Sequence, residues 1–460
     1  MEDIKPKRQQ RRHSSHSPEP ERTGPDRAAF FLLCSIPMLA MVGFGAVDFW
    51  AIAFLAAFAF ILTALWFADG WFRGSFRYST NSLQLPLLGL FIVGILQLLP
   101  LGDSEANGLL PGPASNALSY EPFATRLFLI RLGCCIIFFA AALVFVDSRK
   151  RLKKLTSLIV AFAAAMSFFG ILQRLSGVEA IYGIRQSPNA IFFGPFVNQH
   201  HFAAFVEMGF GLALGLLLNG GVKKNLRIFL LIASALMLIA AASTGSRGGM
   251  ISLFGVAAFC GVFILLRRRR ERASVPLVAI AAGTLLFVLL VGGTALFLGG
   301  GDSLFRAAGL QGGTGDLSSG RFDFWQAAIK IFLEHPLIGA GFDAFGMAFT
   351  KFDQWNGRFR IEQAHNDYLQ ILADGGISGF ACLTAFIFLL FKKGLAAMRD
   401  VSDHFTNAAV LGALAGCFGI LIHSFFDFPL RTHSNAYFFL LLVVIAAGRN
   451  AAPDVKSTPR

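Results

Sequence analysis

The chain has 460 residues, of which 55% are hydrophobic, 13% aromatic and only 15% charged, and its formal net charge is +13. Soluble domains contain about 25% charged residues, so this composition excludes an ordinary soluble protein and indicates a polytopic membrane protein. The basic residues lie in short clusters beside apolar runs, a pattern that orients membrane helices and needs no nucleic-acid partner.

The first segment, residues 1–27, is rich in Lys, Arg, Pro, Ser and His and has too few apolar residues to bury a core. It is predicted to be a disordered cytoplasmic tail. The apolar run that follows is longer than the core of a signal peptide, has no convincing A-x-A cleavage site and is followed at once by another run. We therefore expect a retained membrane helix there.

Because a membrane span needs roughly 20 apolar residues, the sequence predicts about twelve spanning helices. They are expected near residues 28–47, 49–68, 83–100, 127–146, 155–172, 202–219, 227–243, 250–266, 275–298, 377–391, 408–424 and 434–448. The predicted fold class is an all-α polytopic membrane protein with one large external, periplasmic loop that carries short helices.

Basic residues fall on every second connection between these helices, and the positive-inside rule places such connections in the cytoplasm, together with both chain ends. The basic residues are Arg73, Arg77, Arg149, Lys150, Arg151, Lys153, Lys154, Lys223, Lys224, Arg267 to Arg270, Arg272, Lys392 and Lys393. The external loops are then 102–125, 173–201, 243–249, 299–376 and 425–433.

The chain is accordingly expected to divide into five parts. These are the tail 1–27, nine helices with short loops in 28–298, the large periplasmic loop 299–376, three helices in 377–448, and a cytoplasmic tail 449–460. Six cysteines lie within apolar runs, and we predict that they are small core residues, neither disulfides nor metal ligands: Cys34, Cys134, Cys135, Cys260, Cys382 and Cys417.

The large loop is predicted to contain two short helices. Phe322, Trp325, Ile329 and Phe332 recur at helical spacing before Pro336, and a helix with so thin a polar face should pack against the membrane domain. A second helix is expected from about residue 363 to 373, with His365 in its first turn and glycines 375 and 376 at its C-cap.

Two external arginines are candidate ligands of an anion. Arg247 lies in a Ser-Arg-Gly-Gly turn whose glycines let a ligand approach the backbone closely. The alternative, a snorkelling or topology residue, is disfavoured on this side by the positive-inside rule. Arg321 starts the first predicted helix, whose N-terminal N–H groups attract phosphate, although an ordinary surface arginine remains the alternative. Together the two guanidinium groups could bind a diphosphate bidentately.

His365 is the candidate general base, because imidazole titrates near neutral pH and can take the proton of a sugar hydroxyl. On its own, however, a single loop histidine is more often structural than catalytic. Asn366 and Asp367 could orient His365 or the acceptor, and could equally be caps of the following helix.

Four polar residues, Asn198, Gln199, His200 and His201, begin a predicted membrane helix at its external end. They could bind a sugar or a diphosphate, or could simply cap the helix. Two adjacent histidines on a helix cannot both face one metal ion, so zinc is not expected. Arg185, in the same external loop, is a further candidate anion ligand.

The last external segment is HSFFDFPLRTH, with His423, Asp427, Arg431 and His433. It is predicted to be a solvated connection between helices.

Three segments carry a resemblance to a known family: FVNQHHFAAFVEM at 196–208, STGSRGGMISL at 243–253, and GRFDFW, HPLIGAGFDAF and AHNDYLQILADGGISG within 320–379. In content and order these blocks resemble those of the O-antigen ligase and O-antigen polymerase family of bacterial membrane glycosyltransferases, over roughly the C-terminal 260 residues. The resemblance implies transfer of a glycan from undecaprenyl diphosphate to a lipid or saccharide acceptor at the outer face of the inner membrane, in lipopolysaccharide or exopolysaccharide biosynthesis. The key histidine of that family matches His365, so the resemblance also implies a catalytic role for His365.

No cofactor and no metal ion are predicted. Glycosyltransferases that use Mg²⁺ or Mn²⁺ need a carboxylate pair, and the nearest candidate, Asp103 and Glu105, is a weak match that we expect to be solvated. Arginine is therefore favoured over a metal ion as the group that stabilises the leaving diphosphate.

Other functions remain open at this point. A twelve-helix secondary transporter fits the helix count, but transporters usually have polar or broken segments at mid-membrane and two repeated halves, which are not found here. A scaffold without activity would leave the placement of the arginines and the histidine unexplained. Within the family the sequence does not choose between ligase and polymerase, and ligase-like transfer is slightly preferred.

Overall fold

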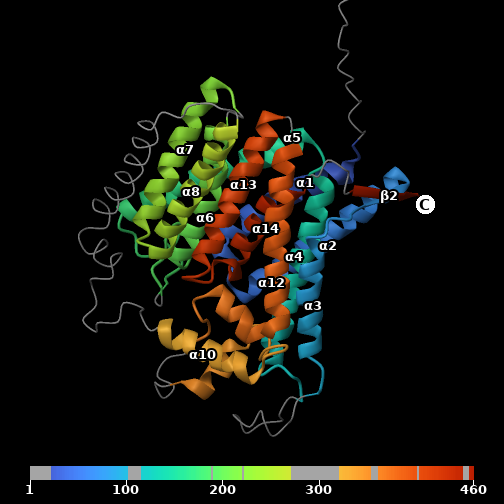
Figure 1. Cartoon of the computed structure of the whole chain (residues 1–460), viewed down its shortest axis with the longest axis vertical. Coiled ribbons are helices and arrows are strands. Elements are labelled where there is room, and N and C mark those ends of the chain that lie inside the picture. Colours follow the sequence, from blue (N-terminus) through green and yellow to red (C-terminus); the bar gives the residue numbers. More distant parts are fainter. Residues whose placement is uncertain are drawn as a thin grey trace, which may run out of the picture.

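Long helices form a bundle, and short helices cover one end of it (Figure 1). The computed structural model describes residues 22–101, 116–187, 190–219, 222–270, 321–353, 361–400, 403–448 and 455–459. In chain order the elements are α1 (Gly24–Val42), η1 (Phe44–Ala46), α2 (Phe49–Arg73), β1 (Ser75–Ser79), α3 (Gln84–Gln97), α4 (Pro122–Phe145), α5 (Arg149–Leu175), α6 (Gln199–Leu218), α7 (Lys224–Ser243), α8 (Arg247–Arg270), α10 (Arg321–Glu334), α11 (Phe345–Phe349), η2 (Thr350–Phe352), α12 (Asp367–Asp400), α13 (His404–His423), η3 (Pro429–Arg431), α14 (His433–Ala447) and β2 (Val455–Pro459).

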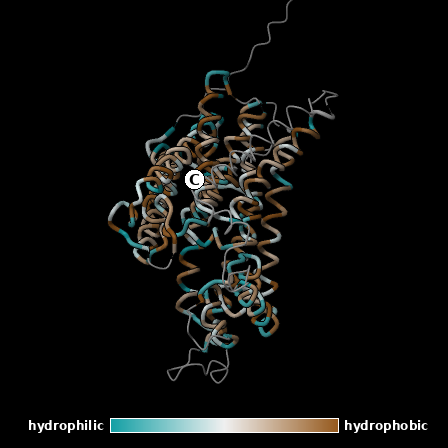
Figure 2. Tube along the Cα trace, turned by 90° about the vertical axis from the view of Figure 1, so that its left-hand side faces the viewer, coloured by the Kyte–Doolittle hydropathy of each residue, from teal (hydrophilic) through white to brown (hydrophobic). Residues whose placement is uncertain are grey.

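Within the described residues, nine helices are long and apolar enough to cross a membrane: α1, α2, α4, α5, α6, α7, α8, α12 and α13. Two shorter apolar helices, α3 and α14, lie among them. These helices account for every predicted span except 275–298, which lies outside the described residues. The protein is therefore a polytopic, mainly helical membrane protein. Figure 2 shows hydrophobic colour along the long helices, with hydrophilic segments at their ends and in the short helices.

One feature departs from the predicted all-α class. Strands β1 and β2 pair in an antiparallel sheet, with Ser75 opposite Pro459 and Ser79 opposite Val455. The last described segment of the chain is thus fixed beside the end of α2. A pairing between segments so far apart in sequence leaves no local pattern, so the prediction did not include it.

The helices α6 and α13 cross very closely at the centre of the bundle. Each has two glycines four residues apart, Gly211 and Gly215 on α6 and Gly412 and Gly416 on α13. A Cβ atom at Gly215 would lie 2.4 Å from the Cα of Gly412. Small residues at this spacing let two membrane helices pack backbone to backbone. The crossing therefore fixes the first turn of α6 relative to the end of α13, and both carry residues of the candidate site.

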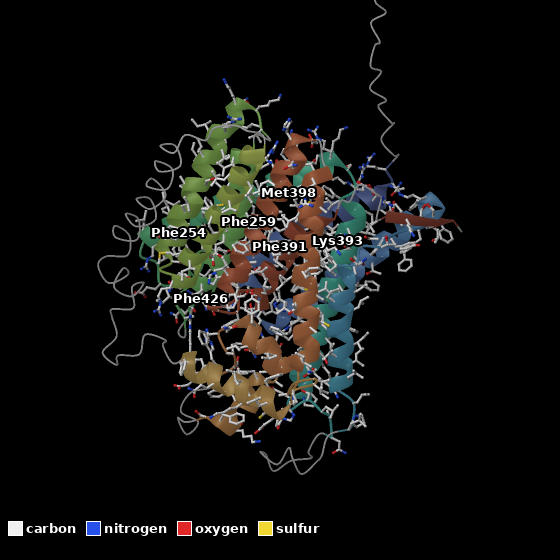
Figure 3. The ribbon with its side chains drawn as sticks, in the orientation of Figure 1. Phe254, Phe259, Phe391, Lys393, Met398 and Phe426 are labelled. Carbon is white, nitrogen blue, oxygen red and sulfur yellow. The ribbon has the colours of Figure 1, made fainter. Side chains whose placement is uncertain are left out.

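Aromatic side chains fill the space between α13 and its other neighbours. Phe259 of α8 lies 5.2 Å from Phe418 of α13 and 6.1 Å from Phe391 of α12, measured between ring centroids. Figure 3 shows Phe259 and Phe391 within the bundle, Phe254 at its outer side, and Phe426 at the end of the bundle that faces the short helices.

We call the short-helix region the cap, and define it as residues 321–353 and 361–376. It has a small core of its own, which includes Phe324, Ile331, Phe345 and Phe349. The cap is joined to the bundle through the buried amide of Gln97, at the end of α3. The Nε2 atom of Gln97 donates to the carbonyl oxygens of Ile338, at 2.6 Å, and Asp374, at 2.7 Å.

Helix α10 is present as predicted, but it buries a different face. Phe324, Ala327, Ala328 and Ile331 are buried, whereas Phe322 is 60% exposed. Apolar residues surround this helix on most sides, so their spacing alone did not identify the face that packs against the rest of the cap.

The second predicted helix of the loop begins later than expected. Helix α12 starts at Asp367 and runs to Asp400, with non-helical backbone at Gly376, where φ is 60°. The glycine break is therefore where the sequence placed it. His365 lies before the helix, with φ of 51°, so the prediction that it occupies the first helical turn is wrong. Asn366 accounts for this, because its side chain caps the helix one residue after His365.

Candidate active site

His365 lies in a slot between two aromatic rings, at the junction of the cap and the bundle. Its ring centroid is 6.0 Å from that of Phe324 and 4.9 Å from that of Phe428. The side chain is 31% exposed. The imidazole is therefore held in position but remains accessible to a substrate.

The orientation of this imidazole is set by Asp427, in the loop between α13 and α14. Nδ1 of His365 lies 3.1 Å from Oδ1 of Asp427. Burial by itself would raise the pKa of the Asp427 carboxyl, but the hydrogen bond with His365 and the nearby imidazoles of His200 and His201 hold that pKa below its ordinary value. An ionised carboxylate can only accept, so Nδ1 donates the proton and Nε2 is left as the basic nitrogen.

Asp427 was not among the predicted site residues, and the prediction that its segment is solvated is wrong. Asp427 and His423 are each 1% exposed. The sequence contained one signal of this burial, because Asp427 is flanked by Phe425, Phe426 and Phe428. Phenylalanines on both sides of a carboxylate indicate that the segment packs against other parts of the protein, and such packing shields the carboxylate from water.

Arg321 is held by the same loop as His365. Its Nη1 atom donates to the carbonyl oxygen of Phe426 at 2.5 Å. Burial lowers the pKa of Arg321, and the positive charge of Arg247 lowers it further, while Asp427 acts in the opposite direction. Arg247 therefore lies close enough to Arg321 for its charge to act on the Arg321 guanidinium group. Two neighbouring guanidinium groups that repel each other in a partly buried place favour the binding of an anion.

The turn that carries Arg247 is closely packed around its glycines. A Cβ atom at Gly248 would lie 3.0 Å from the imidazole Cδ2 of His423, and one at Gly249 would lie 2.9 Å from the Cβ of Ala203. These glycines therefore allow α8 to begin directly against α6 and α13. Their first role is close packing of helices, which places Arg247 beside the site.

The two adjacent histidines of α6 contact different neighbours. Nδ1 of His200 lies 2.9 Å from the Ser246 hydroxyl, beside Arg247. Nδ1 of His201 lies 2.7 Å from the hydroxyl of Thr432, and its ring centroid is 5.0 Å from that of Phe428. Both histidines therefore border the same cluster as His365, but on separate sides.

The remaining predicted residues divide between structural and connecting roles. Asn198 caps α6 through the His200 N–H at 2.8 Å, and the Gln199 N–H donates to the carbonyl of Ile191 at 2.7 Å. Asn366 caps α12. Asp367 accepts a hydrogen bond from the Ser424 hydroxyl at 2.9 Å, so it joins the start of α12 to the end of α13.

Arg185 makes its contacts elsewhere. Its Nη2 atom donates to Asp48 at 2.9 Å, and its guanidinium group lies 4.7 Å from the ring centroid of Phe44. The charge of Arg185 is therefore balanced by a carboxylate near the start of α2.

A buried pair behind the loop was also not predicted. Nδ1 of His423, at the end of α13, lies 2.9 Å from Oε1 of Glu207 on α6, and neither side chain is more than 1% exposed. This pair holds the end of α13 against α6, four residues before Asp427. Within the described residues no group of three or more His, Cys, Asp or Glu side chains is placed to hold a metal ion.

Residues 232–384 match the family model described as O-antigen ligase, which confirms the resemblance for that part of the chain. Arg247, Arg321 and His365 lie inside the matched range, and Asp427, His200 and His201 lie outside it. The chain matches no curated protein.

Proposed function

Since residues 232–384 match the O-antigen ligase family, we propose that the protein transfers a glycan from undecaprenyl diphosphate to an acceptor hydroxyl at the periplasmic face of the inner membrane. The observation that carries this proposal is the pair His365 and Asp427, oriented by a hydrogen bond beside two arginines. A base and a cationic pocket are the two elements that a diphosphate leaving group and a hydroxyl nucleophile require.

In the proposed reaction, Nε2 of His365 takes the proton of the acceptor hydroxyl. The acceptor oxygen forms a bond to the anomeric carbon as the bond from that carbon to the diphosphate oxygen breaks. Attack from the side opposite the leaving group inverts the anomeric configuration. The electron pair of the broken bond remains on the diphosphate, and Arg247 and Arg321 stabilise the charge that develops there.

Asp427 is a positioning residue in this scheme. It keeps the proton on Nδ1 of His365, so that Nε2 faces the acceptor in its basic form, and it stabilises the imidazolium that forms. No metal ion is needed, because the two guanidinium groups supply the positive charge. We call Arg247 and Arg321 the clamp, and Arg185 is not included in it, since its guanidinium group is already paired with Asp48.

The test is release of undecaprenyl diphosphate by the purified protein, reconstituted in vesicles with an undecaprenyl-diphosphate-linked glycan and an acceptor. Release that depends on the acceptor and on His365 would support transfer. If an acceptor that is itself lipid-linked is extended, the protein is a polymerase, and if another saccharide or lipid is glycosylated, it is a ligase. Failure of release with every donor and acceptor, together with movement of a glycan across the vesicle membrane, would favour a transporter.

A further inference from the structure

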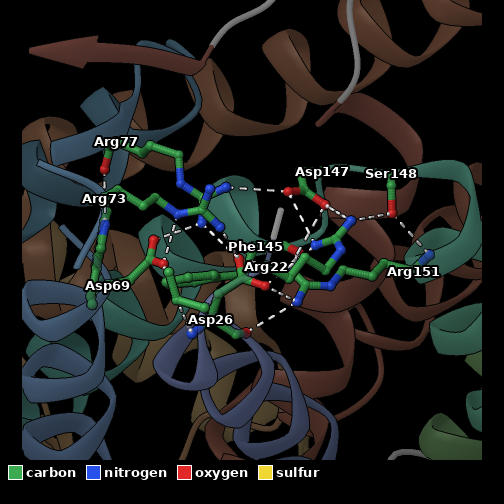
Figure 4. Close-up of polar contacts among 11 residues, drawn as sticks. Arg22, Asp26, Asp69, Arg73, Arg77, Phe145, Asp147, Ser148 and Arg151 are labelled. Atoms are coloured by element: carbon green, nitrogen blue, oxygen red, sulfur yellow. Dashed lines mark hydrogen bonds and ion pairs between the residues drawn. The ribbon is translucent and has the colours of Figure 1, made fainter. Parts of the chain in front are cut away.

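Away from the cap, arginines and aspartates form one buried network where α1, α2, β1 and α5 meet (Figure 4). Its members are Arg22, Arg73, Arg77, Arg151, Asp26, Asp69 and Asp147. Asp26 is at its centre and is fully buried. It accepts from Arg151 and, at 2.8 Å, from Nη2 of Arg77, which also donates to Asp69 at 2.8 Å.

The charges of this network do not cancel. Within the part of the chain that the structure describes, four arginines face three aspartates, which leaves one positive charge. The arginine side chains are between 6% and 17% exposed, so water compensates little of it. In addition, the buried Nε atom of Arg77 has no hydrogen-bond partner among the described residues. An excess positive charge among these described residues, with little access to water, is unfavourable by itself and favours a bound anion.

An open pocket of about 800 Å³ lies directly against the network. Arg22, Arg73 and Arg77 line it, together with the first turn of α1 and Ser457 of β2. The N-terminus of α1 adds only its partial positive charge, because Pro25 has no N–H and the N–H of Asp26 is already bonded to the hydroxyl of Thr23.

The pocket opens at the end of a membrane-spanning helix. Trp71 and Phe72 belong to the last turn of α2 and are 69% and 70% exposed, and Phe72 also lines the pocket. Exposed aromatic residues at the end of a span are typical of the level of the lipid headgroups. An anion that enters here therefore lies where the phosphates of the bilayer lie.

We propose that this pocket binds the phosphate of an anionic phospholipid from the leaflet on this side of the membrane. Arg22 and Arg73 contact the headgroup phosphate, and the acyl chains run along the exposed apolar surface of α2. Basic pockets between membrane helices recognise anionic lipids by this combination of contacts. The site is separate from the cluster around His365 and does not depend on the proposed transfer reaction.

The test adds dioleoyl phosphatidylglycerol or dioleoyl phosphatidylcholine to the purified full chain in detergent, and measures the Tm. Phosphatidylglycerol should raise the Tm by roughly 2 °C or more relative to phosphatidylcholine, because a ligand that binds only the folded state stabilises it. Native mass spectrometry should show phosphatidylglycerol retained on the protein.

Two neighbouring residues of β2 offer a matched pair of variants. Ser457 lines the pocket, and successive strand residues point to opposite faces, so a carboxylate at 458 points away from it. Ser457→Glu should abolish the shift in Tm, and Thr458→Glu should retain it. Arg73→Gln should also lose the shift, whereas Arg149→Gln, which removes the exposed partner of Asp403, should not.

Three outcomes would overturn the proposal. The first is an equal effect of the two lipids on the wild-type chain. The second is an equal response of the two β2 variants. The third is a rise in Tm with inorganic phosphate as large as that with phosphatidylglycerol, which would make the pocket a site for free phosphate.

Discussion

The imidazole of His365 and the carboxylate of Asp427 are 62 positions apart in the sequence, yet Nδ1 and Oδ1 lie 3.1 Å apart. This contact joins the cap to the loop between α13 and α14. The same loop accepts a hydrogen bond from Arg321, at the carbonyl of Phe426. The proposed base and one of the two proposed cations are therefore positioned by two consecutive loop residues.

Replacing the base should stop transfer without preventing donor binding. We expect His365→Ala to lower the rate of transfer by about 10²–10⁴-fold, the usual effect of losing a positioned general base. The rate is measured as release of undecaprenyl diphosphate, and donor binding is measured separately. His335→Ala is the matched control, because His335 is a cap histidine whose hydrogen bond is made to Tyr120 instead. Equal loss in both variants would contradict the assignment.

Asp427→Asn tests the positioning role. The amide can donate to Nδ1 of His365, which favours the tautomer with its proton on Nε2, and that tautomer cannot act as the base. Transfer should fall by about 10²–10⁴-fold while the protein still folds. The Tm of the variant and its donor affinity should stay close to those of the wild type. A variant with full activity would show that Asp427 has only a structural role.

The role of the clamp can be tested with variants that keep the positive charge of each side chain but change its shape. Lysine lacks the planar fork with which arginine binds a diphosphate, so Arg247→Lys and Arg321→Lys should each lower the rate of transfer by about 10²-fold. Arg185→Lys should have a much smaller effect, since Arg185 pairs with Asp48. If Arg185→Lys lowers transfer as much as the other two, the clamp includes this third arginine.

Chelation should leave the reaction unchanged. Addition of EDTA to the reconstituted protein is expected to have little effect on release of undecaprenyl diphosphate, because the arginines supply the positive charge at the leaving group. Loss of activity with EDTA, and its recovery with Mg²⁺, would show that the proposed role of the arginines is wrong.

The close crossing of α6 and α13 predicts a large difference between two glycine-to-alanine variants. A Cβ atom at Gly215 would lie 2.4 Å from the Cα of Gly412, whereas one at Gly261 on α8 meets no atom within 4 Å. Gly215→Ala should destabilise the protein by about 1–3 kcal/mol, as overpacking usually does, and Gly261→Ala should not. Thermal unfolding of the two variants measures the difference.

The sequence predicted the helices well because long apolar runs have few other solutions in a membrane. It placed Arg247, Arg321 and His365 in external segments on one side of the membrane, and their shared role in one site stays a prediction. It did not predict the burial of Asp427, because a short polar segment between two helices looks solvated unless the fold around it is known. The buried face of α10 and the pairing of β1 with β2 were missed for the same reason, as both depend on distant parts of the chain.

The loop between α13 and α14 also bears on how this protein could be recombined with its relatives. The matched range ends at residue 384, well before Phe426 and Asp427. A chimera that exchanged only residues 232–384 would receive a new histidine and new arginines, but it would keep the old loop that must hold them. We therefore expect such exchanges to work only when the loop is exchanged along with the matched segment, so that the smallest exchangeable part of the chain is longer than the matched range.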